Sequence, residues 1–155
     1  MDTEDQLYGE TVKALAASAF GAGRLADAQG RGRAASPLCG DRADIEVRLA
    51  ADGTIAALAH QVRGCLVCRA AAAALAQAAP GQAAESVAAA HRALAALLTA
   101  SVTPPEPFAG LPAFAAFQAF APLRRHRARH ECALVPLRAA EAAVAQAQAE
   151  SRPVA

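Results

Sequence analysis

The chain has 155 residues, enough for one domain with a core of its own and too few for two comfortable ones. Hydrophobic residues make up 55% of it, but many of them are alanine and only 4% of the residues are aromatic, so we expect a helix-rich, thinly filled core. The formal net charge of +1 gives no overall field that would attract nucleic acid or an anionic membrane.

The first part of the chain predicts one helix followed by a loop. Apolar residues at approximately helical spacing predict a helix over residues 5–20. Residues 21–37 are rich in glycine, arginine and small residues, which is typical of a loop, with room for one short edge strand.

The next segment predicts a β-hairpin over residues 43–63. Apolar and charged residues alternate over 43–49, as in a strand with one buried face. Residues 51–54 have the composition of a tight turn, and a second strand is expected over 55–62. His60, within this second strand, is expected to have a structural role.

Two helices are predicted after the hairpin. Residues 65–79 contain no glycine or proline and predict a helix that ends at Pro80-Gly81. Residues 83–100 predict a second helix. An extended linker is then predicted by three prolines, Pro104, Pro105 and Pro107.

The last third of the chain predicts a short helix and a long one. Three phenylalanines at helical spacing predict a short helix that ends at Pro122 and packs its rings into the core: Phe114, Phe117 and Phe120. A last helix is expected to begin near Cys132 or just past Pro136 and to run to about Glu150.

The order of these elements predicts an α+β fold, with a small antiparallel β-sheet of two to three strands packed against several α-helices in a single domain over residues 1–155. Residues 1–13 are acidic and polar, and no apolar stretch approaches the roughly 20 residues of a membrane span. We therefore expect a cytoplasmic protein, whose four cysteines stay reduced and serve metal binding or thiol chemistry.

Cys39 and Cys65 stand at the two ends of the predicted hairpin. Cys39 lies in a tight turn just before the first strand, and Cys65 follows the second strand. Because the strands are antiparallel, the start of the first and the end of the second are neighbours in space. The hairpin therefore brings Cys39 and Cys65 to the same edge of the sheet.

The residues around these cysteines suit a metal site. Gly40 lets the backbone turn beside Cys39, and Asp41 adds a carboxylate oxygen that zinc accepts and can exchange. Cys65 and Cys132 are each expected at a helix N-terminus, where the positive end of the dipole favours the thiolate. Three thiolates and one carboxylate make a four-ligand set.

Cys68 and His130 each have two interpretations. Cys68 lies one helical turn after Cys65, so it either reaches the site or packs under the sheet. The spacing of these two cysteines is also that of redox dithiols, but no βαβ pattern surrounds them. His130 is either a further ligand or proton carrier, or a surface histidine in a basic loop. The basic residues within 124–130 either steer an acidic partner or form a solvated loop.

Three segments resemble the U-type iron–sulfur cluster assembly scaffolds, the group of the NifU N-terminal domain, IscU and SufU. The segment Ser36-Pro37-Leu38-Cys39-Gly40-Asp41-Arg42 resembles the family's first cysteine motif, usually Asn-Pro-x-Cys-Gly-Asp. Arg63-Gly64-Cys65-Leu66-Val67-Cys68 resembles its Gly-Cys helix start. His130-Glu131-Cys132-Ala133-Leu134 resembles its third motif. The resemblance covers about residues 7–145.

The resemblance implies that zinc or a [2Fe–2S] cluster is held by four residues, Cys39, Asp41, Cys65 and Cys132. Members of the family accept persulfide sulfur from a cysteine desulfurase and build a cluster or pass the sulfur on, with iron–sulfur apoproteins or carriers downstream. Glu131, in place of a histidine, and the long gap before Cys132 indicate the SufU-like branch, in which a zinc-bound protein works mainly as a sulfur acceptor. The first candidate to take the persulfide is Cys39, and the second is Cys132. A scaffold of this kind need not be an enzyme; zinc-dependent sulfurtransferase activity is the alternative.

Two other functions fit the same cysteines. One is a structural zinc-binding interaction module without sulfur transfer, whose four thiolates are those of Cys39, Cys65, Cys68 and Cys132. The other is a dithiol redox enzyme that uses Cys65 and Cys68. The chain departs from the family pattern at Cys68, where a small polar residue is usual, and a thiolate there would displace Asp41 from the metal.

Overall fold

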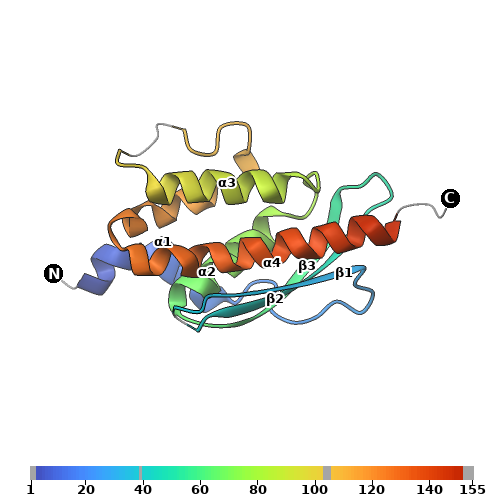
Figure 1. The fold of residues 1–155 in the computed structure, drawn as a ribbon, viewed down its shortest axis with the longest axis horizontal. Coiled ribbons are helices and arrows are strands. Elements are labelled where there is room, and N and C mark those ends of the chain that lie inside the picture. The colour runs from blue at the N-terminus through green and yellow to red at the C-terminus, as the bar shows by residue number, and fades with distance from the viewer. Residues whose placement is uncertain (1–2, 39, 103–105, 152–155) are drawn as a thin grey trace.

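The computed structural model describes residues 3–38, 40–102 and 106–151, and it shows five helices and three strands among them (Figure 1). The elements in chain order are α1 (Thr3–Ser18), β1 (Gly30–Ala35), β2 (Arg42–Leu49), β3 (Ile55–Arg63), α2 (Leu66–Ala78), α3 (Ser86–Thr99), the 3₁₀ helix η1 (Pro112–Arg125) and α4 (Arg127–Ser151). The fold is α+β, as predicted. Within the described ranges, no helix combines the length and the apolar character that crossing a membrane requires.

The three strands form one antiparallel sheet in the order β1-β2-β3. β2 and β3 are the predicted hairpin, with Arg42 opposite Arg63. β1 is the short edge strand within residues 21–37, and its last residue, Ala35, pairs with Arg42. Because both neighbours of β2 run antiparallel to it, the β1–β2 connection and the end of β3 lie at the same end of the sheet.

α4 lies across one face of the sheet (Figure 1). Ile45 of β2 is fully buried on this face. β1 approaches α4 so closely that side chains would not fit: a Cβ at Gly32 would lie 2.1 Å from the carbonyl oxygen of Ala139, and one at Gly30 would lie 1.9 Å from that of Ala143. The glycines of β1 and the alanines of α4 therefore let backbone pack against backbone.

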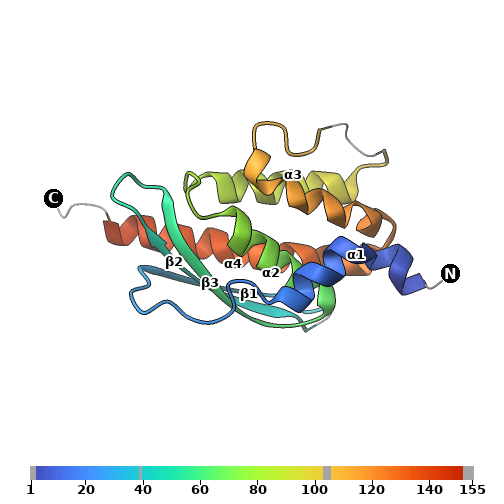
Figure 2. The same cartoon turned by 180° about the vertical axis from the view of Figure 1, so that it is seen from behind.

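The remaining helices complete the core. α2 and α3 also pack against α4, and α1 lies beside α2 (Figure 2). The prediction that the phenylalanines of η1 pack into the core is confirmed: all three are fully buried, and neighbouring ring centroids lie 5.8 to 6.3 Å apart for Phe114, Phe117 and Phe120. These rings supply volume that alanine does not.

The predicted end of the short helix at Pro122 is wrong. η1 runs on to Arg125, and it is a 3₁₀ helix. A period of three residues per turn places the phenylalanines, which are three residues apart, on one face. Pro122 is exposed, and its missing N–H removes one hydrogen bond of this helix.

The predicted start of the last helix is also wrong. α4 begins at Arg127 and continues through Pro136. A proline inside a helix costs about 3 kcal/mol, but residues 132–137 are buried, and their packing offsets this cost. Cys132 therefore lies in the second turn of α4 and not at its N-terminus. α1 differs from the predicted 5–20 by two residues at each end, and Gly9 interrupts it with a non-helical conformation.

Candidate metal centre

The connection between β1 and β2 is a short loop closed by backbone hydrogen bonds. The N–H of Ser36 donates to the carbonyl oxygen of Asp41 at 2.8 Å, and the N–H of Gly40 donates to the carbonyl oxygen of Ser36 at 2.9 Å. These bonds fix Asp41 just before β2, where only 3% of it is exposed. Cys39, predicted in this turn, lies outside the described residues. Its neighbours Leu38 and Gly40 are exposed.

Cys65 lies opposite Asp41, at the junction of β3 and α2. It is the N-cap residue of α2, which confirms the prediction of a cysteine at a helix N-terminus. Its backbone N–H donates to Oδ1 of Asp41 at 3.1 Å, and its thiol donates to Oδ2 at 3.2 Å. The carboxylate therefore lies beside the positive end of the α2 dipole, which stabilises it.

Gly64 leaves the space that Asp41 occupies. A Cβ at Gly64 would lie 2.7 Å from Cγ of Asp41 and 2.9 Å from its Oδ1. Real side chains do not approach so closely, so any other residue at this position would push the carboxyl group away from Cys65. The glycine of the Gly-Cys motif is thus part of the geometry of the site.

α4 brings a third donor, Cys132. It is fully buried, and its Sγ lies 4.0 Å from the carbonyl oxygen of Ala128, one turn earlier in the helix. One ligand atom from each of Asp41, Cys65 and Cys132 lies within 4.8 Å of the other two. The helix dipole was the wrong reason to expect a ligand here, since Cys132 reaches the group because α4 packs across β1 and β2.

Two thiols and one carboxylate suit zinc and iron. Atoms bound to one tetrahedral zinc lie roughly 3.3 to 3.8 Å apart, because the bonds are about 2.0 to 2.3 Å long. The three atoms, all within 4.8 Å of one another, need only a small contraction to share an ion. The described residues supply three donors, and a closed zinc site takes four.

The structure gives Cys68 and His130 other surroundings. Cys68 is fully buried in the hydrophobic core and is not a member of the three-residue donor group. Nε2 of His130 lies 2.8 Å from the carbonyl oxygen of Leu123 and 3.2 Å from that of Arg124. Because a carbonyl only accepts, Nε2 carries the proton and donates to the end of η1.

Three arginines beside the donor group were not predicted to have a role. Arg42 follows Asp41 directly, and Arg63 lies two residues before Cys65. The backbone N–H of Arg69, one helical turn later, donates to the carbonyl oxygen of Cys65 at 3.1 Å. The sequence does show that these arginines lie close to the predicted ligands Asp41 and Cys65. The meaning of this closeness depends on strand register, which the sequence alone did not show.

Comparison with known proteins shows the family of this chain. A family model described as NifU-like N terminal domain matches residues 19–150. The chain belongs to this family. The resemblance of the three cysteine-bearing segments to the U-type scaffolds is thereby confirmed. No curated protein matches the chain.

Solved structures share the fold of this NifU-like domain. The crystal structure of a nitrogen-fixing NifU-like protein (N-terminal) from Brucella abortus has a TM-score of 0.83 and 24% identity, over 97% of this chain and 100% of that one. A putative iron–sulfur cluster assembly scaffold protein for the SUF system, from the thermophilic Fervidobacterium islandicum AW-1, has a TM-score of 0.75 and 14% identity, over 90% of this chain and 98% of that one. At these identities the two matches establish a common fold.

Proposed function

We propose that this NifU-like protein is an iron–sulfur cluster assembly scaffold that carries its cargo on Cys39, Asp41, Cys65 and Cys132. The observation that carries the proposal is the donor group itself, in which a carboxylate oxygen and two sulfurs from three separate segments lie within 4.8 Å of one another. Zinc is the alternative occupant of the same ligands. Family membership and the scaffold described for the SUF system support this assignment.

Cys39 is proposed as the fourth ligand because the chain tethers it to the site. Two residues of extended chain span at most about 7 Å, so the Cα of residue 39 cannot lie farther than this from that of Asp41. Asp41 is itself held in place by Ser36 and by Cys65. Chain connectivity therefore allows Cys39 to supply the fourth ligand.

The sulfur-handling step is a thiol–disulfide type of exchange. A cysteine thiolate of this chain attacks the outer sulfur of the persulfide on a cysteine desulfurase; a new S–S bond forms, the old one breaks, and the desulfurase cysteine leaves as a thiolate. Cys39 remains the first candidate, since its neighbours Leu38 and Gly40 are exposed. Cys132 is the weaker one, because it is fully buried on α4.

Asp41 would keep the site exchangeable. A carboxylate binds zinc or iron less tightly than a thiolate does, so a site with one carboxylate releases cargo more readily than a site with four thiolates. The burial of Asp41 and its two hydrogen bonds to Cys65 support its place among the ligands.

The SufU-like preference rests on the third motif. Glu131, which stands where the IscU branch has a histidine, accepts a hydrogen bond from the guanidinium group of Arg138 at 2.6 Å. His130 donates to the end of η1. Neither residue belongs to the donor group of the described residues. The proposal is therefore a SufU-like sulfur acceptor whose four ligands include no histidine.

The test is the metal and acid-labile sulfide content of protein purified without oxygen, before and after incubation with a cysteine desulfurase, cysteine and ferrous iron. A scaffold acquires visible charge-transfer absorption and about two irons and two sulfides per cluster. A sulfur acceptor instead retains zinc and acquires persulfide, which mass spectrometry locates on one cysteine. One zinc with no cluster and no persulfide would leave only the structural zinc-binding module.

A further inference from the structure

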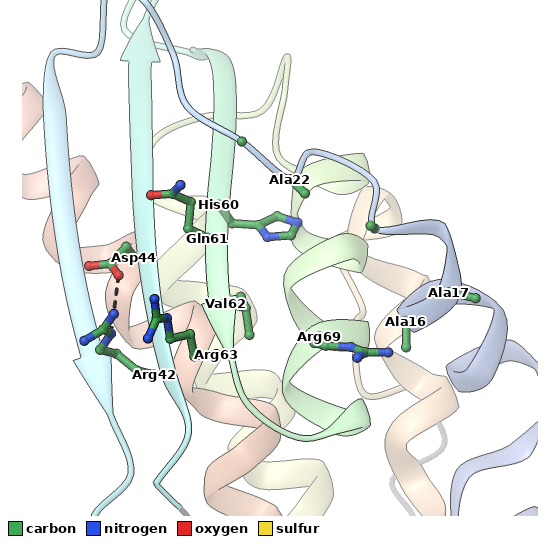
Figure 3. A pocket seen from close by; sticks show the side chains of 12 residues that line it. Ala16, Ala17, Ala22, Arg42, Asp44, His60, Gln61, Val62, Arg63 and Arg69 are labelled. Carbon is green, nitrogen blue, oxygen red and sulfur yellow. Dashed lines mark ion pairs between the residues drawn. The ribbon is translucent and has the colours of Figure 1, made fainter.

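A pocket of about 640 Å³ opens along the outer edge of β3, between this strand, the start of α2 and the chain around residues 16–23 (Figure 3). Its volume is within the range of small-molecule sites. Four alanines around the turn between α1 and the sheet form its apolar side, Ala16, Ala17, Ala19 and Ala22.

Arginines give the pocket a positive charge. Arg42 and Arg63 are cross-strand partners and lie side by side in Figure 3. Arg69 extends from α2 towards Ala16, and Val62 lies between Arg63 and Arg69. Asp44 is the only acidic residue of the lining, and it already pairs with Arg33 and Arg42. The lining thus carries more positive than negative charge, and within the described part of the chain neither Arg63 nor Arg69 forms an ion pair.

The edge of β3 offers a backbone donor between these arginines. At His60 the outward N–H and C=O are bonded to Gly21 and Gly23. Outward-facing groups recur every second residue of a strand, so those of Val62 face the same edge. No described residue hydrogen-bonds to them. One residue of open edge is too short to add a peptide strand, but its N–H suits a single carboxylate.

His60 leaves a further polar atom without a partner at the wall of the pocket. Its Nε2 lies 2.7 Å from the carbonyl oxygen of Phe20 and must donate to it, which leaves Nδ1 as an acceptor. Burial lowers the pKa of His60, so the ring is neutral near pH 7. Nδ1 is buried and has no hydrogen-bond partner within the described part of the chain, although His60 is only 4% exposed.

We propose that this pocket binds a small dicarboxylate, with one carboxylate at Arg63 and the Val62 N–H and the other at Arg69. Planar guanidinium groups match the geometry of carboxylates. Because Arg63 and Arg69 lie on opposite sides of Val62, they favour a ligand with a carboxylate at each end. The alanine side accommodates the carbon chain between those ends. This inference goes beyond the proposed function and does not depend on it.

The experiment is calorimetric titration of the protein as purified, at low salt and without iron or desulfurase. The probes are succinate and malate, with propionate as the matched monoanion. Neither dicarboxylate at millimolar concentration competes strongly with thiolates for zinc, so the metal site is not the readout. We expect saturable binding of one dicarboxylate, at least tenfold tighter than that of propionate.

The variants are Arg63→Gln and Arg69→Gln, with Arg92→Gln as the control. Arg92 is an exposed arginine of α3 away from this pocket, so its replacement changes the net charge equally. Each pocket variant should weaken succinate binding at least tenfold, and the control should stay within twofold, with unchanged thermal unfolding in all three.

Three results would overturn the proposal. One is the absence of saturable binding of either dicarboxylate. Another is equal weakening by Arg92→Gln, which would mean general charge attraction. The third is binding of a glutamate-rich peptide through Arg63 and Arg69 without binding of the dicarboxylates, which would make the pocket a docking surface for an acidic protein. Since none of these measurements involves a cluster, failure here is distinguishable from failure of the scaffold function.

Discussion

Gly32 and Gly64 both lie where a side chain would collide with its surroundings, but the obstacles differ. At Gly32 the obstacle is the backbone of α4, with the carbonyl oxygen of Ala139 at 2.1 Å and the amide nitrogen of Ala143 at 2.5 Å from a Cβ. At Gly64 it is the side chain of Asp41. A packed helix cannot move aside, whereas a carboxyl group can rotate away at the cost of its bonds to Cys65. The covered face of the sheet therefore determines the stability of the fold, and the end of the sheet holds the proposed metal site.

The largest expected effect is that of Gly32→Ala. The added methyl group must separate β1 from α4, and overpacking of this kind typically costs 1 to 3 kcal/mol, so we expect about 3 kcal/mol in the free energy of unfolding, measured by urea denaturation. Ala35→Val is the control, because Ala35 lies on the same strand and is exposed. If the free energy of unfolding fell by the same small amount in both variants, β1 would not pack against α4 as described.

Replacement of two cysteines separates the site from the core next to it. Cys65→Ser removes a proposed ligand and should weaken zinc binding at least about 100-fold, beyond the 10- to 100-fold typical of residues behind the ligands. Competition with a chromophoric chelator measures this affinity. Cys68→Ala, which keeps the core apolar, should lower stability slightly and leave zinc affinity within about threefold, because Cys68 is not in the donor group.

The opposite result for Cys68→Ala would change the assignment. An equal loss of zinc affinity in the two variants would mean that Cys68 is a ligand and that the four-thiolate module is correct. An intramolecular disulfide between the two cysteines in metal-free protein, lost in either variant, would instead support the dithiol enzyme.

The covered face and the site also differ in how far the sequence predicted them. Alternation over residues 43–49 and the turn that follows predicted the hairpin, whose strand ends place Asp41 next to Cys65. These are local signals, and the structure agrees with them. The position of Cys132 within α4 was not predicted correctly. Pro136 suggested a helix boundary, but the burial of the residues around Pro136 lets the helix continue through it.

The contacts of the glycines could not be predicted from the sequence either. Gly30 and Gly32 were assigned to a loop with at most a short strand, since glycine is unfavourable within strands. Only the approach of α4, about 110 residues later in the chain, explains them. Long-range packing of this kind leaves no periodic pattern in the sequence. The arginine pocket escaped prediction for the same reason, as it combines residues from two strands and a helix.

Gly64→Ala tests whether the glycine at the end of the sheet positions Asp41 for metal binding. The methyl group should displace the carboxyl group of Asp41 and weaken its bonds to Cys65, so we expect zinc affinity to fall about tenfold, the scale of changes behind the ligands. The free energy of unfolding of the metal-free protein should fall by less than about 1 kcal/mol, because a side chain can yield where backbone cannot.

Gly53→Ala is the matched control for this variant. Gly53 lies in the β2–β3 turn with a φ of +88° and no atoms near its Cβ position, so alanine there strains the backbone without touching the site. Its unfolding free energy should fall by about 1 kcal/mol with zinc affinity unchanged. Comparable losses of affinity in the two variants would show that general destabilisation, and not Asp41, sets the metal affinity.

The smallest expected effect concerns His60, which lies on β3 between the two regions. Burial lowers the pKa of His60 below its ordinary value of 6.5, against the weaker opposite effect of its bond to the Phe20 carbonyl. The unfolded chain therefore takes up a proton at higher pH than the folded one, so stability should fall as the pH drops below about 6.5.

His60→Gln, which keeps a donor for the carbonyl of Phe20, should remove this pH-dependent part of the stability, worth less than about 1 kcal/mol between pH 7 and 5.5. His126→Gln is the control, because it removes an exposed histidine outside the sheet. Because His60 packs under the sheet and is not among the donor residues, zinc affinity at pH 7.5 should be the same in both variants; a loss in His60→Gln alone would mean that the core and the metal site are coupled through β3.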